Sequence, residues 1–127
     1  MMWNPQDFPQ WQAMQYLQTI AARFGPGAVP QVFYSVDSVE AQRQILIARR
    51  GWPALFAYVG GRLLIPESPW EDAARFAGLQ SEEIAGHLKD GEGARLFRAQ
   101  APPAALIEAY RTRKGPVLLA GGRVAPD

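Results

Sequence analysis

Residues 49–66 read RRGWPALFAYVGGRLLIP, an apolar stretch with a Gly-Gly pair near its centre. This pattern predicts a β-hairpin, with one strand over 54–59 and a second over 62–65. Gly60 and Gly61 then form the turn, because glycine takes the positive φ angles of a two-residue primed turn at no steric cost.

In that register Tyr58 lies opposite Leu63. On the other side of the hairpin, Ala57 lies opposite Leu64. Both faces are apolar apart from Arg62. We therefore expect helices to cover the hairpin on both sides.

The length and composition are those of one soluble domain covering residues 1–127. The hydrophobic fraction is 48% and the charged fraction is 20%, both ordinary for a globular protein. No apolar run approaches the roughly 18 residues of a membrane span, so no membrane partner is expected. The first residues carry neither a basic start nor an apolar run, which predicts no secretion signal and a cytoplasmic location.

The chain has no cysteine, which excludes disulfides, thiol catalysis and cysteine metal sites. Its single histidine, His87, cannot build a metal site alone, and we expect no catalytic residue, metal or cofactor. The net charge of +1 gives no reason to expect nucleic acid. Residues 67–92 carry seven acids against two basic residues, whereas 93–127 carry six basic residues against two acids. Such an asymmetry is typical either of a binding face or of solvated helix faces.

Apolar spacing, capping signals and glycine or proline stops predict the remaining elements. The predicted helices cover 9–24, 37–50, 68–78, a short segment from Ser81, and 102–115, and the predicted strands outside the hairpin cover 31–36, 94–99 and 116–120. The first helix opens with a capping box in which Asp7 accepts backbone N–H groups and Gln10 reaches back. The predicted order is α-β-α-β-β-α-α-β-α-β.

Several of these residues occur in an order similar to that of the thioredoxin family. Trp3 precedes a helix start at 7–10 (DFPQ), much as a tryptophan precedes the Cys-x-Pro-Cys start in that family. Residues 17–21 (LQTIA) resemble the following helix, and 50–54 (RGWPA) resembles the family's Arg-Gly-Ile-Pro-Thr segment, whose proline is cis. The hairpin and a closing helix complete the resemblance.

The family begins with a β-α-β unit that is missing before Trp3, but 94–120 is predicted to be such a unit. Residues 1–90 therefore resemble thioredoxin from its active-site helix to its last helix, and 91–127 resemble its usual N-terminal unit. The resemblance implies an α/β fold, a circularly permuted thioredoxin-like central mixed sheet flanked by helices. Nearby termini tolerate such a permutation.

Two alternatives remain open. In a domain-swapped homodimer, the C-terminal unit completes the sheet of a second copy. In a ferredoxin-like α+β fold, residues 31–99 supply the order β-α-β-β-α-β.

The resemblance also implies a binding site. Asp7 and Gln10 replace the family's cysteines, so disulfide exchange is excluded. A cis Pro53 would shape a groove in which extended segments pair with the backbone, with Trp52 as an anchor. Trp3, Phe8 and Trp11 would lie around its rim, although Trp11 also heads the apolar stripe of its helix. The candidate site residues, none of them catalytic, are Trp3, Asp7, Phe8, Trp52 and Pro53.

The expected function is accordingly a non-redox, protein-binding module, namely a chaperone, assembly factor or adaptor that binds a peptide or a partner's segment. One alternative is a structural component of a larger assembly, such as a phage or secretion particle. Another is a small enzyme without thiol chemistry on the ferredoxin-like fold.

Overall fold

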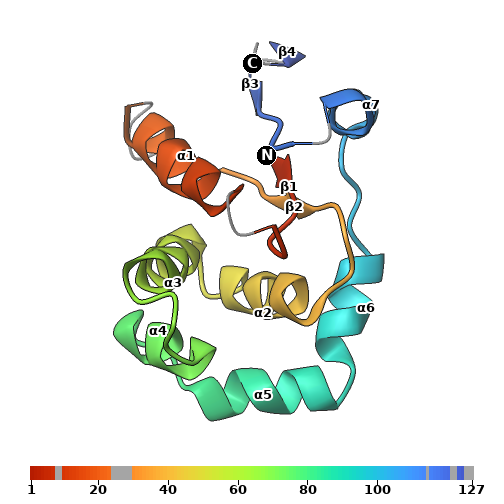
Figure 1. Ribbon diagram of the computed structural model, residues 1–127. Helices are drawn as coiled ribbons and strands as arrows, with labels where there is room; N and C mark the ends of the chain where they lie inside the picture. The colour runs from red at the N-terminus through yellow and green to blue at the C-terminus, as the bar shows by residue number, and fades with distance from the viewer. Residues whose placement is uncertain (8–9, 24–29, 114, 121–122, 125–127) are drawn as a thin grey trace.

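The Gly60-Gly61 pair that predicted a turn lies inside a helix. The computed structural model describes residues 1–7, 10–23, 30–113, 115–120 and 123–124, and over these residues it is mostly helical (Figure 1). The elements are β1 (Met2–Trp3), α1 (Trp11–Arg23), β2 (Phe33–Tyr34), α2 (Val39–Ala48), α3 (Trp52–Leu64), α4 (Trp70–Phe76), α5 (Ser81–Lys89), α6 (Glu92–Arg98), α7 (Ala104–Arg113), β3 (Leu119–Ala120) and β4 (Arg123–Val124).

The predicted hairpin is wrong, because α3 runs through both of its strands and its turn. Pro53 lies in the first turn of α3, where a missing N–H costs nothing and the fixed φ favours a helix. Before it, Gly51 takes a φ of 109°, which an L side chain rarely adopts. The buried residues of α3 are Leu55, Phe56, Tyr58, Val59 and Gly61. This spacing fits one face of a helix, not alternate positions of a strand.

The two glycines of α3 have different surroundings. A Cβ added at Gly60 would meet nothing within 4 Å. A Cβ added at Gly61 would lie 3.3 Å from both Cα and Cβ of Ala73 on α4. Gly61 therefore permits the close approach of α3 and α4, while Gly60 has no packing role of this kind.

The predicted central sheet is also wrong, so neither the thioredoxin-like fold nor the ferredoxin-like alternative is present. Over the described part of the chain, β1 pairs in parallel only with β2, and β3 pairs with β4. Met2 also makes an isolated antiparallel bridge to Val117, with N–H···O distances of 2.9 and 3.0 Å. The segment predicted as the last strand thus contacts the N-terminal strand of its own chain.

The strand predicted over 94–99 is helix α6 instead. Gly91 precedes it in the left-handed conformation, with a φ of 88°, and Asp90 accepts the backbone N–H of Glu92. Glu92 in turn pairs with Arg95 one turn later. These local capping and side-chain interactions favour a helix over an extended strand.

Five predicted helices are confirmed, as α1, α2, α4, α5 and α7. In α2 the cap is Ser38, whose hydroxyl accepts the N–H of Ala41 at 3.1 Å. Asp37, at the predicted start of this helix, accepts the side-chain amide of Gln42. The predicted strand over 31–36 shortens to β2.

Helix α2 contacts α3, α5 and α6, while α4 lies beside α3 at the outer edge of the molecule (Figure 1). The largest fully buried side chains are Trp3, Trp11, Tyr58, Met14, Ile47, Leu55, Leu106, Gln44, Val59 and Val117. Over the residues whose placement is described, no helix combines the length and the hydropathy of a bilayer span.

The two glycines of α3 provide a test of this fold. Gly60→Ala should raise the free energy of unfolding by about 0.5–1 kcal/mol, since alanine favours a helix interior and Gly60 has open space. Gly61→Ala should be less stable than Gly60→Ala, because its Cβ meets the backbone of Ala73. Urea denaturation of the three proteins measures both differences.

A hairpin would give a different result. Both positions would then have positive φ, and alanine at either one would destabilise the protein. A loss of stability in Gly60→Ala would therefore contradict the helical assignment of residues 52–64.

Candidate functional site

The structure places the predicted groove residues in different environments. Trp3 is fully buried, with its ring edge-on to Trp11 at a centroid distance of 5.8 Å, so both belong to the core. Trp52 is half-buried and packs on Phe56. Phe8 lies outside the described residues.

The predicted cis peptide at Pro53 is wrong. No cis peptide bond occurs over the described residues, so the Trp52–Pro53 bond is trans. Pro53 is an exposed residue in the first turn of α3, and it shapes no groove beside a strand.

Asp7 is an exposed residue before α1, where the recorded contacts differ from the predicted capping box. Its backbone carbonyl accepts the N–H of Gln10 at 2.9 Å, and its carboxylate accepts the Gln10 side-chain amide at 3.2 Å. Gln10 does reach back, but to the backbone N–H of Asn4, at 2.8 Å. This arrangement stabilises the start of α1.

A buried carboxylate, which the sequence pattern suggested only as part of a helix cap, joins three helices. Glu40 on α2 is only 8% exposed, and the hydroxyl of Tyr58 on α3 lies 2.9 Å from both of its oxygens. Gln44 and Arg43 also donate to this carboxylate, each at 2.9 Å. The Arg43 guanidinium lies over the ring of Trp70 on α4, 4.7 Å from its centroid. We call these five residues the Glu40 network.

The Glu40 network keeps its tyrosine protonated. Burial, and then the negative charge of Glu40, raise the pKa of the Tyr58 hydroxyl far above its ordinary value. The same two causes raise the pKa of the buried Tyr34. Tyr58 therefore remains a hydrogen-bond donor to Glu40. Because Tyr58 is fully buried, this network has a structural role.

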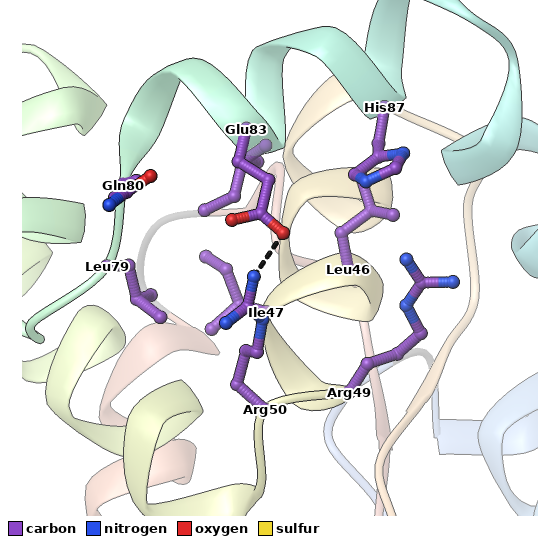
Figure 2. Close-up of a pocket in the computed structure, with 9 residues that line it drawn as sticks. Leu46, Ile47, Arg49, Arg50, Leu79, Gln80, Glu83 and His87 are labelled. Carbon is purple, nitrogen blue, oxygen red and sulfur yellow. Dashed lines mark hydrogen bonds and ion pairs between the residues drawn. The ribbon is translucent and has the colours of Figure 1, made fainter.

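A small pocket lies where the C-terminal end of α2 meets α5 (Figure 2). Leu46 and Ile47 line it from α2, and Arg50 reaches across to Glu83, with which it forms an ion pair. The pocket is partly open, and the centre of a water molecule can move within about 20 Å³ of it, which is room for about one water molecule.

The two arginines near this pocket already have acidic partners. Arg49 pairs with Glu92 at 3.1 Å, and His87 Nδ1 lies 3.4 Å from a carboxylate oxygen of Asp90. The pKa of Glu92 is lowered, first by its hydrogen bond from Arg95. The arginines also lie at the negative end of the α2 dipole, which stabilises them there. The pocket is best explained as a junction between helices.

Two carboxylates, the buried Glu40 and the exposed Glu83, test the structural roles given to the Glu40 network and to the pocket ion pair. Glu40→Gln should lower the free energy of unfolding by about 2–3 kcal/mol, since it removes a buried charge that accepts several hydrogen bonds. Glu83→Gln, at an exposed ion pair, should change it by less than about 1 kcal/mol. Chemical denaturation at neutral pH compares the two. Similar losses for both variants would contradict a special role for the Glu40 network.

The most distinctive surface feature is a group of three exposed apolar side chains at the junction of α3 and α4. Leu64 is 73% exposed, Phe76 is 67% exposed, and Ile65, just after α3, is 43% exposed. We call these three residues the α3–α4 patch.

The members of the α3–α4 patch are neighbours in space as well as in type. Cδ1 of Phe76 would lie 3.4 Å from a Cβ placed on Gly61, which puts the Phe76 ring against α3. Leu64 is the last residue of α3, three residues after Gly61, and Ile65 is the C-cap that follows it. Three large apolar side chains therefore surround the C-terminal end of α3.

The sequence pattern did not indicate this surface. As strand residues, Leu64 and Ile65 were expected to be covered by helices, and Phe76 was not singled out. A helical interpretation of 52–64 would have separated the buried positions from Leu64, because Leu55, Tyr58 and Val59 share a face at helical spacing.

Several acidic side chains of the described residues form no ion pair. In the described part of the chain, Glu67, Glu71 and Glu82 have no basic partner. Glu67 follows the patch by two residues, and Glu71 lies in the first turn of α4. No group of three or more metal-ligating side chains was found among the residues described.

Comparison with protein-family models, with curated proteins and with solved structures found no match to this chain. These comparisons therefore assign no family. Among the residues that the structure describes, the central sheet implied by the thioredoxin resemblance is absent.

Proposed function

We propose that this chain is a protein-binding module, of the adaptor, assembly-factor or chaperone kind, that holds a partner's segment on the α3–α4 patch. The observation that supports the proposal is the exposure of Leu64, Ile65 and Phe76 beside one another. Grouped apolar side chains on a surface mark interaction sites, whereas isolated ones are common.

The α3–α4 patch replaces the groove that the sequence suggested. That groove required a cis Pro53 beside a strand, and neither feature is present. The enzyme alternative rested on a ferredoxin-like sheet, which is also absent over the described residues. The small pocket at α2 and α5 has room for about one water and paired charges, so it offers a substrate little space.

The chain offers a matched control for the patch. Val39 is 56% exposed and opens α2 at the end that lies beside α6, away from α4 (Figure 1). Val39→Ser removes an exposed apolar side chain of similar kind from another surface. Neither change should affect stability by more than about 0.5 kcal/mol, because surface substitutions rarely do.

The test is affinity enrichment with three forms of the full chain: the unchanged protein, Leu64→Ser/Phe76→Ser, and Val39→Ser. The proposal expects at least one protein that is retained by the unchanged chain and by Val39→Ser. The patch variant should bind that protein at least about tenfold more weakly in a purified binding assay, since a central apolar anchor contributes more than 1.4 kcal/mol. Equal binding by all three forms would contradict the proposal.

A further inference from the structure

We infer that the side chain of Gln100 closes the outer edge of β2 in place of a further strand, and thereby prevents β2 from pairing with the same segment of a second copy of the chain. The α3–α4 patch has no part in this pairing. The sequence of residues 31–36, the direction of their backbone groups and the hydrogen bonds of the Gln100 amide each support this role.

The segment that contains β2 has the composition of a strand that pairs with itself. Residues 31–36 read QVFYSV, with no charge, no proline and no glycine. Val, Phe and Tyr favour strands, and short neutral segments of this kind pair with their own copies when an edge is open. Pro30 and Asp37 flank the segment, and proline and charged residues in such places oppose aggregation. The centre of the segment requires protection of its own.

The backbone of β2 bonds β1 on one side only. Phe33 and Ser35 donate their N–H groups to the carbonyls of Met1 and Trp3, at 2.7 and 3.0 Å. Tyr34 lies between them, and successive residues of a strand direct their backbone groups to opposite sides. The N–H and C=O of Tyr34 therefore point away from β1, and these are the groups that a further strand would bond.

Gln100, in the connection between α6 and α7, bonds both of these groups. Its side-chain oxygen accepts the N–H of Tyr34 at 2.8 Å, and its side-chain NH₂ group donates to the Tyr34 carbonyl at 3.3 Å. The same NH₂ group donates to the carbonyl of Phe97, in the last turn of α6, at 3.2 Å. A reversed amide would place two donors against each other, so the partners fix its orientation. The amide thus takes the place of a neighbouring strand at Tyr34.

Two substitutions at Gln100 separate closure of the edge from stability. Gln100→Ala removes all three hydrogen bonds and leaves the edge open and neutral. Gln100→Glu also loses the two donated bonds, but it keeps an acceptor for the Tyr34 N–H and places a charge at the edge, which opposes pairing with another strand. Gln42→Ala, which removes one side-chain hydrogen bond to Asp37, is the control.

Sedimentation velocity of the full chain at increasing concentration measures self-association. Gln100→Ala should associate at concentrations at least about tenfold lower than the unchanged protein does, because its edge is open to a second copy. Adding Leu64→Ser/Phe76→Ser should leave this association unchanged. Gln100→Glu and Gln42→Ala should behave like the unchanged protein. The inference is overturned if Gln100→Ala associates no more readily than the unchanged protein, or if Gln100→Glu associates as readily as Gln100→Ala.

Amide hydrogen exchange, followed for each residue by NMR, tests the hydrogen bonds without relying on a variant. In the unchanged protein the Tyr34 N–H should exchange as slowly as those of Phe33 and Ser35, although it faces away from β1. In dilute, monomeric Gln100→Ala it should exchange at least about tenfold faster, because its acceptor is gone. Fast exchange at Tyr34 in the unchanged protein would contradict closure of the edge, even where Gln100→Ala does not fold.

Discussion

The hydrogen bond between Tyr58 and Glu40 ties the helical part of this chain together. It joins α2 to α3 in the buried interior, and Arg43 extends the connection to Trp70 on α4. A buried carboxylate is tolerated only when several donors surround it, as they do here. This requirement fixes the rotation of α3, because Tyr58 must face α2.

That rotation decides what the surface presents. With Tyr58, Leu55 and Val59 facing inward, Gly61 meets α4 and Leu64 is left exposed at the C-terminal end of α3. The α3–α4 patch is thus a consequence of how the Glu40 network orients α3. The same side chains in a hairpin would alternate between two covered faces, and no such patch would form.

Helices whose ends carry capping or stop residues were predictable from the sequence, whereas the structure of residues 49–66 was not. The polar residues at 37–38 and the glycine stop at Gly78 mark helix ends to within about a residue, because local chemistry acts within a few residues. In 49–66 the local signals disagree. The glycine pair favours a turn at a cost of about 1 kcal/mol per glycine in a helix, whereas burying one large apolar side chain contributes about 1.5–3 kcal/mol. Burial of Phe56 and Tyr58 against neighbouring helices therefore outweighs the turn preference.

The sequence by itself determined that thiol chemistry is impossible, and it located five of the helices through their caps, stops and apolar spacing. Only the tertiary structure decided that 52–64 is a helix, that Trp3 is core and that Leu64 and Phe76 share a surface. The physical reason is the sequence separation over which each interaction acts. Caps and turns involve residues that are neighbours in sequence, whereas burial depends on which distant segment covers a side chain. A sequence with apolar residues on both sides of a Gly-Gly pair leaves that choice open, and α2 and α4 resolve it by packing against α3.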